Sequence, residues 1–565
     1  MYQPDLTPVA DSLAASSLVA LLPLLTVFLT LGVLRWKAHL AGLSALGVSL
    51  VVAVAVYGMP VDLAALSTTQ GMVFGLFPIM WIVVNAIWLY ELTVRSGRFN
   101  DLRAVINAIS DDPRVQAIII AFCFGGLLEA LAGFGAPVAI TGVMLLAVGF
   151  TPMRAAVVVL LANTAPVAFG AIATPIITAG TLTGIDYTEI GAVVGHQTPF
   201  LALIVPLLLV LLADGKRGVR ETWPIAVVVG FVFAVAQYAS ATYFSVELTD
   251  IVASLAGLIA AVVMLRVWTP AGGAEARSRL LAEMDAEQGD APAGGTGAAD
   301  SPAGGVALDQ QTDAPALTAG RVLMALFPYL LVIVVFSIAK LVDPVKEWLL
   351  GTDLVFGWPG LDGNLLTAAG DPSTSPTYTF GWLSAPGSLL LICGVVVALV
   401  YRLSLAEAAR AYGQNLMKLR FSILTVASVL GLAYVMNQSG QTITVGTWIA
   451  GTGAAFAFFS PILGWLGTAV TGSDTSANAL FATLQQTAAE RAGIDPTLLV
   501  AANTSGGVVG KMISPQNLTI AATAVGLVGR ESDIFRKVIG WSVGLLLILC
   551  VLVGLQSTVL SWMLP

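Results

Sequence analysis

The motif ANTAPVAFGAIATP, residues 162–175, recurs later in the chain as ANTSGGVVGKMISP, residues 502–515. The two copies share an Asn-Thr pair, a glycine and a final hydroxyl residue followed by proline, at the same spacing and 340 residues apart. The matched positions are Asn163, Thr164, Gly170, Thr174 and Pro175 in the first copy and Asn503, Thr504, Gly510, Ser514 and Pro515 in the second. A match at constant spacing indicates that one structural unit has been duplicated.

The duplication extends upstream of both motifs. A glycine interrupts an apolar stretch in each half, at Gly133 and at Gly472, which are 339 residues apart. Before those stretches, Ser96 and Ser439 each precede a glycine at the end of an apolar run, at an offset of 343 residues. The repeated unit therefore includes several consecutive helices, not one motif.

Most of the chain is apolar enough to lie in a lipid bilayer. Of its 565 residues, 57% are hydrophobic and only 10% are charged, whereas soluble domains carry roughly 25% charged residues. A membrane-spanning helix needs about 20 mostly apolar residues. Such runs occupy 13–34, 38–57, 70–93, 154–179, 190–213, 223–244, 250–267, 320–341, 386–402, 421–437, 497–526 and 537–563. We therefore predict an all-α polytopic membrane protein with about twelve transmembrane helices.

Two further apolar stretches, 116–150 and 446–487, are interrupted by small and helix-breaking residues. The interrupting residues are Gly133, Gly135 and Pro137 in the first stretch and Gly472, Ser473 and Asp474 in the second. Each stretch predicts either two crossings or one re-entrant hairpin, and both alternatives return the chain to its starting side. We expect two re-entrant hairpins in addition to the twelve helices.

The loop charges predict the orientation of these helices, because Lys and Arg concentrate in short cytoplasmic loops. Basic residues occur near 35–37, 95–114, 216–220, 266–279, 402–420 and 530–537, while the intervening loops at 58–69, 180–189 and 245–249 contain none. The pattern predicts a protein of the bacterial inner membrane with both termini facing outward.

The sequence divides into two transmembrane repeats, residues 1–220 and 319–565, joined by connecting helices at 221–268 and a linker at 269–318. The linker is rich in Ala, Gly, Pro and Asp and nearly lacks bulky apolar residues, which predicts a disordered cytoplasmic segment. An insertion at 343–384, on the predicted outer face, contains three tryptophans. It either caps the mouth of the protein or rests on the lipid headgroups, and the tryptophans favour the headgroups.

The charge pattern places Ser96 inside and Ser439 outside, so that the two copies are antiparallel. Inverted repeats with interrupted helices are typical of secondary transporters, whose substrate site lies where the repeats meet. Unwound backbone within hydrocarbon persists only around a polar cavity, and the exposed helix N-termini there favour an anion. The expected hairpin and helix breaks are Gly133, Gly135, Pro137, Pro175, Gly472 and Pro515. This arrangement suits a carboxylate substrate.

Several longer strings resemble the L-lactate permease family over nearly the whole chain. They are Phe122–Gly125, Glu129, Ala132–Thr141, Asn163–Gly170, Phe459–Pro461, Gly464–Gly467, Thr471–Ser476, Ala501–Thr504 and Gly510–Gln516. The resemblance implies proton-coupled import of L-lactate, often with D-lactate and glycolate. The linker and the outer insertion depart from the resemblance, which leaves their roles open.

Two carboxyl groups are candidates for proton coupling. Glu129 lies in an apolar stretch, where a carboxylate is unfavourable unless it takes up a proton or finds a cation. Its alternative role is structural, bonded to backbone or near water at the base of the hairpin. Asp474 lies at the break of the second hairpin, where it either caps a half-helix or titrates opposite Glu129.

Lys511 is the basic residue deepest in either repeat, and we expect it to bind the substrate carboxylate. Its alternative is a lysine that extends its ammonium group to the membrane surface. Neighbouring polar residues could donate to a carboxylate or hydroxyl group, or else bond neighbouring helices together. These candidate substrate-binding residues are Asn163, Thr164, Ser473, Asn503, Thr504 and Ser505.

The sequence as a whole predicts a proton symporter for L-lactate that works by alternating access around a central anion site. A sodium-coupled carboxylate transporter is the alternative within the same class, and an anion channel or a membrane sensor is the alternative outside it. No nucleotide-binding loop, catalytic nucleophile with a base or His/Cys metal motif is present, so we expect no enzyme activity, metal or cofactor. The chain also lacks the basic tracts of nucleic-acid-binding proteins.

Overall fold

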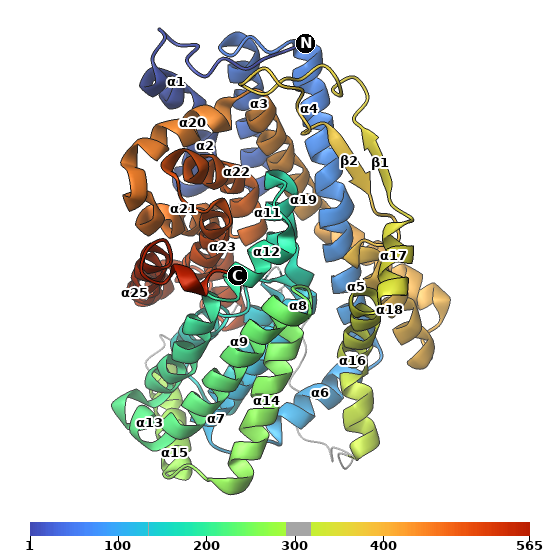
Figure 1. Cartoon of the computed structure of the whole chain (residues 1–565). Helices are drawn as coiled ribbons and strands as arrows, with labels where there is room; N and C mark the ends of the chain where they lie inside the picture. The colour runs from blue at the N-terminus through green and yellow to red at the C-terminus, as the bar shows by residue number, and fades with distance from the viewer. Residues whose placement is uncertain (35, 134, 290–317) are drawn as a thin grey trace.

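The computed structural model describes residues 1–34, 36–133, 135–289 and 318–565, and it consists mainly of helices (Figure 1). Ten helical stretches in this described part are long and apolar enough to cross a membrane, and four shorter apolar helices accompany them. The prediction of a polytopic helical membrane protein is confirmed. The structure thus has fewer long helical stretches than the twelve expected. Some of the predicted helices are short or interrupted, and two of them are counted as one continuous stretch, Tyr187–Phe244.

Fourteen helices precede the linker. They are α1 (Leu13–Ala20), α2 (Leu22–Val27), α3 (Ala38–Ala55), α4 (Val61–Phe74), α5 (Trp81–Arg95), α6 (Arg98–Asn107), α7 (Pro113–Gln116), α8 (Gly125–Ala132), α9 (Ala136–Val148), α10 (Pro152–Ala162), α11 (Thr174–Thr183), α12 (Tyr187–Val194), α13 (Thr198–Ala239) and α14 (Thr249–Val267). Wider helical turns at Gly75–Met80 and Ala117–Phe124 join α4 to α5 and α7 to α8.

The second half begins with a helix in the linker and contains one small sheet. Its elements are α15 (Gly273–Gly289), α16 (Ala319–Leu341), α17 (Asp343–Leu350), β1 (Leu354–Gly357), β2 (Thr377–Phe380), α18 (Pro386–Val400), α19 (Leu405–Gln438), α20 (Gln441–Ile449), α21 (Phe456–Thr471), α22 (Asp474–Ala492), α23 (Pro496–Lys511), α24 (Pro515–Ala524) and α25 (Glu531–Gln556). The antiparallel pair β1 and β2 belongs to the insertion at 343–384, so the described fold is not purely α-helical.

Both interrupted apolar stretches fold back on themselves. In the first, α8 ends before Gly133 and α9 packs against α8 and the turns preceding it. In the second, α21 and α22 pack together on either side of Gly472. Gly135 and Gly472 have φ angles of 87° and 76°, in the left-handed region that favours glycine. Glycine thus permits the sharp reversal at each tip.

The helices that carry the duplicated motif are interrupted, and not continuous as the runs 154–179 and 497–526 predicted. The first ends at Ala162 and resumes at Thr174, and the second ends at Lys511 and resumes at Pro515. Pro175 and Pro515 occupy the first turns of the new helices. Proline has no backbone N–H group, but the first N–H groups of a helix have no partner within the helix, so none is lost there. Proline therefore marks the restart of each helix.

Helix α13 contains most of two predicted spans, 190–213 and 223–244, joined by a tight turn. Asp214 and Gly215 leave the helical conformation, and the chain reverses there. Gly230 in the second arm lies so close to the first that an added Cβ atom would be 2.9 Å from the carbonyl oxygen of Leu203. The two spans are therefore the arms of one closely packed helical hairpin.

Helix α19 runs antiparallel to α4 and α5 (Figure 1). Gln438, at its end, donates a hydrogen bond to Gln70 of α4, whereas Gln414, near its start, accepts one from Arg95 of α5. A helix rises 1.5 Å per residue, so Gln414 and Gln438 are separated by about 36 Å, which exceeds the hydrocarbon thickness of about 30 Å. The ends of α5 and α19 consequently lie at opposite ends of the bundle.

The contacts between the two halves occur in reciprocal pairs. Helix α11 packs on α22, and its counterpart α24 packs on α9. Likewise α12 packs on α23, and α25 packs on α10. In the repeat, α9, α10, α11 and α12 of the first half correspond to α22, α23, α24 and α25 of the second. Each of these contacts is therefore found a second time with the two halves exchanged.

Charged residues from several of the basic loops meet at one end of the molecule. Arg321 and Arg98 both pair with Asp101, and Arg154 pairs with Glu283 at 2.8 Å. Asp214, at the turn of α13, accepts from Arg279 at 2.7 Å. The loops that the charge pattern assigned to one side are therefore joined to one another.

The expectation of a disordered segment at 269–318 was wrong for its first part, since residues 273–289 form α15. Its composition of Ala, Glu, Leu and Arg favours a helix, and Ala276 and Leu280 are fully buried on one face. Residues 290–317 of the predicted linker lie outside the described residues.

Arg114 connects three parts of this charged end. Its guanidinium is buried and donates to Asp112, Asp214, Glu221 and the carbonyl oxygen of Ala271. Three carboxylates converge on it, and Arg279 shares one of them, that of Asp214, so Arg114 is the central cation of the network.

We expect Arg114→Met to destabilise the protein by about 3–5 kcal/mol, because removing one partner of a buried ion pair leaves the others unpaired. Thermal unfolding in detergent measures the loss. The matched control is Arg530→Met, which removes an exposed pair with Asp533 and should change stability by about 1 kcal/mol or less. Equal unfolding temperatures for the two variants would contradict the prediction.

The insertion at 343–384 packs on the protein at the end that carries the N-terminus (Figure 1). Tyr378 of β2 donates to the carbonyl oxygen of Phe77 at 2.7 Å, and burial raises the pKa of its phenol to about 12. Tyr2 pairs with Leu365, and Gln70 donates to Ser375. The insertion is therefore anchored to the N-terminal segment and to α4.

Candidate functional site

A small cavity of about 40 Å³ lies where both hairpin tips and both helix interruptions converge. Its lining comes from the two halves of the chain and comprises Glu129, Gly133, Val167, Gly170, Ala171, Thr174, Pro175, Gly472, Ser473, Asp474, Thr475, Lys511 and Gln516. A volume of this size holds about three water molecules. Seven of the predicted site and break positions thus meet at one place: Glu129, Gly133, Pro175, Gly472, Ser473, Asp474 and Lys511.

Glu129 and Lys511 form a buried ion pair across this cavity. The Lys511 ammonium donates to Glu129 Oε1 at 2.7 Å, and Asn163 Nδ2 donates to Glu129 Oε2 at 3.0 Å. Glu129 is 2% exposed and Lys511 is 8% exposed. Such a pair survives burial because each charge compensates the other and both carboxylate oxygens accept hydrogen bonds. Lys511 therefore points into the protein and does not extend to the membrane surface.

Asp474 lies on the second hairpin, at the first turn of α22. It is 4% exposed; its Oδ1 accepts from Thr468 Oγ1 at 3.3 Å, and Oδ2 has no hydrogen-bond partner among the described residues. A Cβ atom added to Gly507 would lie 1.9 Å from Oδ1. Because Gly507 and Lys511 are one helical turn apart on α23, the Asp474 carboxyl lies along the same face of α23 as the ammonium.

Three helices begin at the cavity wall. Thr174 and Pro175 start α11, Asp474 and Thr475 start α22, and Gln516 belongs to the first turn of α24. Ser473 caps α22 by accepting from the backbone N–H of Ser476. Helix N-termini carry partial positive charge and free N–H groups. Together with Lys511, they make the cavity suitable for a small anion.

The structure does not bring five of the predicted polar residues to the cavity lining. Asn163 contacts the site only through its hydrogen bond to Glu129. Thr164 donates to Leu161 of its own helix turn, and Ser505 donates to Gln197. Asn503 and Thr504 both donate to Asn478 of α22. The bonds of Ser505, Asn503 and Thr504 hold neighbouring segments together, which is the alternative role that the sequence left open.

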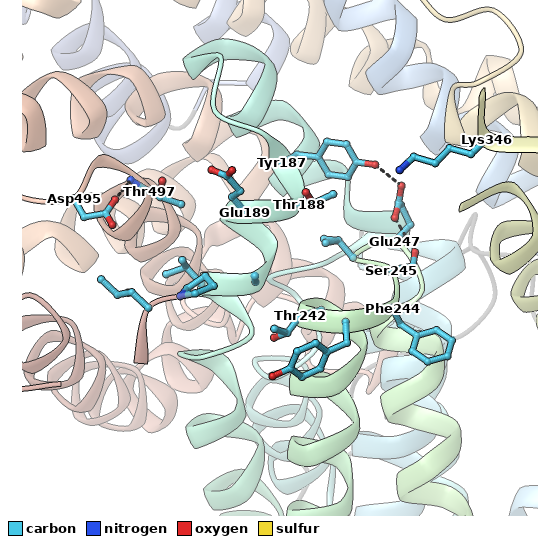
Figure 2. Close-up of a pocket in the computed structure, with 17 residues that line it drawn as sticks. Tyr187, Thr188, Glu189, Thr242, Phe244, Ser245, Glu247, Lys346, Asp495 and Thr497 are labelled. Atoms are coloured by element: carbon cyan, nitrogen blue, oxygen red, sulfur yellow. Dashed lines mark hydrogen bonds between the residues drawn. The ribbon is translucent and has the colours of Figure 1, made fainter. Parts of the chain in front are cut away.

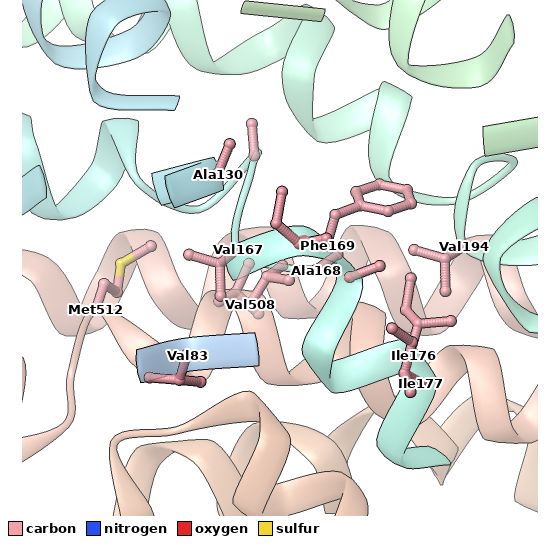
Figure 3. Packing of buried hydrophobic residues seen from close by; sticks show 14 of the residues in the cluster. Val83, Ala130, Val167, Ala168, Phe169, Ile176, Ile177, Val194, Val508 and Met512 are labelled. Carbon is pink, nitrogen blue, oxygen red and sulfur yellow. The ribbon is translucent and has the colours of Figure 1, made fainter. Parts of the chain in front are cut away.

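Apolar packing fixes the interrupted segment of the first half. Val167, Ala168 and Phe169 belong to one buried cluster with Ala130 of α8 and Val508 of α23 (Figure 3). This packing holds the non-helical backbone of residues 163–173 beside the cavity, so the interruption is a fixed part of the site.

One buried acid near the site was missed by reasoning from sequence. Asp250, in the first turn of α14, is 1% exposed, and neither carboxylate oxygen has a partner among the described residues. It opens the apolar run 250–267, where an acidic residue usually caps a helix at the membrane surface. Only the packing of α14 against α8 reveals its position.

A larger hollow of about 570 Å³ opens elsewhere, lined mainly by α12, by residues 241–247 before α14 and by Lys346 (Figure 2). Tyr187 and Ser245 donate to Glu247 within it, at 2.9 and 2.8 Å, and Lys346 points toward Glu247. In the described part of the chain, no three His, Cys, Asp or Glu side chains are grouped as metal ligands.

The comparisons with known proteins agree with one another. The family model described as L-lactate permease matches residues 16–560. The L-lactate permease of Bacillus subtilis strain 168 is 42% identical over 99% of both chains. The glycolate permease GlcA of Escherichia coli K12 is 40% identical over 100% of this chain and 99% of its own. The L-lactate permease of the same strain is 40% identical over 100% of both chains.

Among solved structures, Neisseria gonorrhoeae MtrF aligns with 87% of this chain and 83% of its own at 12% identity. The TM-score of 0.34 is too low to assign a shared fold.

Proposed function

Because the chain belongs to the L-lactate permease family, which consists of transporters and not enzymes, we propose that it imports L-lactate together with a proton and accepts D-lactate and glycolate as well. The observation that carries this proposal is the buried ammonium of Lys511, which faces Glu129 in a cavity where two hairpin tips and two interrupted helices meet. A bound monocarboxylate would take the place of Glu129 as the partner of Lys511.

The repeats support an alternating-access mechanism. We propose that they are inverted copies in a bacterial inner membrane, each with a re-entrant hairpin, and that the basic loops face the cytoplasm and both termini face outward. The antiparallel course of α19 against α4 and α5 and the reciprocal helix contacts support the inversion. Two such copies around one central site can open to either side in turn.

Charge balance links the proton to the substrate. With Glu129 ionised, its ion pair occupies the Lys511 ammonium, and a second carboxylate in the same buried space is strongly unfavourable. A proton on Glu129 or Asp474 removes one negative charge and allows the substrate carboxylate to bind. Asn163 and Ser473 are then positioned to donate to the carboxylate or the hydroxyl group of lactate.

The present cavity is smaller than lactate, since its 40 Å³ holds about three water molecules. We infer that this is a closed arrangement, in which Glu129 pairs with the ammonium that would bind the substrate. Separation of the two hairpin tips at Gly133 and Gly472 would enlarge the space toward one side of the membrane.

The decisive experiment is uptake of labelled L-lactate by the purified protein in proteoliposomes. We expect accumulation when the outside is acidic, abolished when an ionophore collapses the pH gradient and unchanged when sodium is omitted. Competition with unlabelled D-lactate and glycolate tests the range of substrates. Accumulation driven by sodium alone would instead identify a sodium-coupled carrier, and flux that never exceeds equilibrium would identify a channel.

A further inference from the structure

Asp250 differs from the other buried acids near the cavity because it has no visible structural role. It lies in the first turn of α14, yet α14 has no side-chain cap hydrogen bond, and both Asp250 oxygens lack a partner among the described residues. A buried carboxyl group without hydrogen bonds is costly. The stability of the helix therefore does not explain its burial.

The packing of α14 on α8 places Asp250 beside the Glu129–Lys511 pair. An added Cβ atom at Gly257 would lie 3.2 Å from Cys123 Sγ, and one at Gly126 would lie 2.5 Å from Ser254 Oγ. The two helical segments are thus antiparallel. One turn beyond Ser254, Asp250 is level with the turn of α8 that carries Glu129.

Glu129 and Lys511 both act electrostatically on Asp250: the first opposes its negative charge and the second favours it. One ammonium therefore serves three nearby carboxyl groups, those of Glu129, Asp250 and Asp474. Three negative charges around one buried positive charge would be highly unfavourable, so this group of side chains is suited to holding protons.

The chain segment that precedes Asp250 lines the larger hollow. Glu247 precedes it by three residues, lines the hollow and accepts hydrogen bonds from Tyr187 and Ser245 (Figure 2). Thr242 also lines the hollow, and its hydroxyl group has no partner among the described residues. Polar groups thus extend from the hollow, through the first turn of α14, to the substrate cavity.

We propose that Asp250 is a proton-carrying residue, which passes protons between the Glu247 side of the hollow and Glu129 along a route separate from that of the substrate. The inference rests on the proposed proton symport and deepens it. A proton from water in the hollow binds the carboxylate of Asp250, moves from there to Glu129 and breaks its ion pair with Lys511. The ammonium is then available to the incoming carboxylate, and the proton leaves with the substrate on the other side.

The test compares two kinds of transport by the Asp250→Asn variant in proteoliposomes. Asparagine resembles the protonated acid in shape but cannot release or accept a proton. Accumulation of labelled L-lactate driven by a pH gradient should fall by about 100-fold or more, the range expected when a proton-transfer group is removed. Exchange of labelled for unlabelled lactate at equal concentration and pH should stay within a few fold of wild type, because exchange needs no net movement of protons.

Asp250→Glu should recover part of the accumulation, since it restores a carboxyl group. The control is Asp186→Asn, an exposed residue that caps α12 and remains able to cap it as asparagine. Accumulation by Asp250→Asn at the wild-type level would overturn the inference, and so would parallel loss of exchange and accumulation in a folded protein. The wild-type arm tests the proposed symport independently, because absence of pH-driven uptake there would refute the function itself.

Discussion

Replacement of Lys511 by methionine should abolish lactate binding while the protein still folds and inserts. Methionine keeps most of the length of the side chain and removes its charge. The lost pairing of a buried ammonium with the substrate carboxylate is worth about 2–5 kcal/mol, which corresponds to a loss of affinity of roughly 30-fold to several thousand-fold. Glu129 loses its cation but can take up a proton, which limits the damage to the fold.

Binding is measured by ligand-induced thermal stabilisation of the purified protein across a range of lactate concentrations. Elution as a single peak in size-exclusion chromatography verifies the fold. The control is Lys418→Met, since that lysine is exposed, pairs with Glu91 at 2.7 Å and lies on α19, which contributes no residue to the cavity lining. Wild-type affinity in the Lys511 variant would remove this residue from the substrate site.

The main elements of the fold follow from local patterns. Apolar runs, glycine at the hairpin tips and proline at Pro175 and Pro515 each act over a few residues, and the structure places helices, reversals and restarts there. The segment 273–289 was misjudged for a physical reason. Its composition is polar, but contacts with the rest of the protein bury Ala276 and Leu280 and stabilise a helix.

The two copies of the duplicated motif show the limit of local inference for the site. Asn163 ends α10 and bonds Glu129, whereas the matched Asn503 lies within the continuous helix α23 and bonds Asn478. The identical Asn-Thr pair therefore has a different role in each half, because the helix stops at different points. The repeat predicts that both positions are buried, but not which one contacts Glu129.

Lys511 and Glu129 were each identifiable as a charge in an apolar segment, while their pairing was not, because 382 residues separate them. Asp250 was not identifiable at all. Its position depends on the depth at which α14 enters the bundle, and an acid at the start of an apolar run gives no sign of that depth. Tertiary packing alone distinguishes it from a surface cap.

Glu129→Gln should uncouple lactate binding from the proton. Glutamine resembles the protonated acid, so the Lys511 ammonium is permanently free to bind the substrate. In the wild type, a carboxylate must take up a proton before the anion binds, so the affinity should fall as pH rises, by at most tenfold per pH unit, a direct consequence of linkage. In the variant the affinity should be independent of pH, and accumulation driven by a pH gradient should fall to simple equilibration.

This result is checked by measuring the dissociation constant of lactate at several pH values. A range of about 4 units, from pH 5 to pH 9, spans the usual titration of shifted carboxyl groups. Asp474→Asn is the informative comparison, because Asp474 is the other candidate and has a free carboxylate oxygen facing the same cavity among the described residues. If Glu129→Gln keeps the wild-type pH dependence and Asp474→Asn loses it, the proton resides on Asp474, and Glu129 serves only to hold Lys511 in the empty state. Loss of pH dependence in Glu129→Gln alone assigns both tasks to one carboxyl group: it occupies the ammonium when ionised and admits the substrate when protonated.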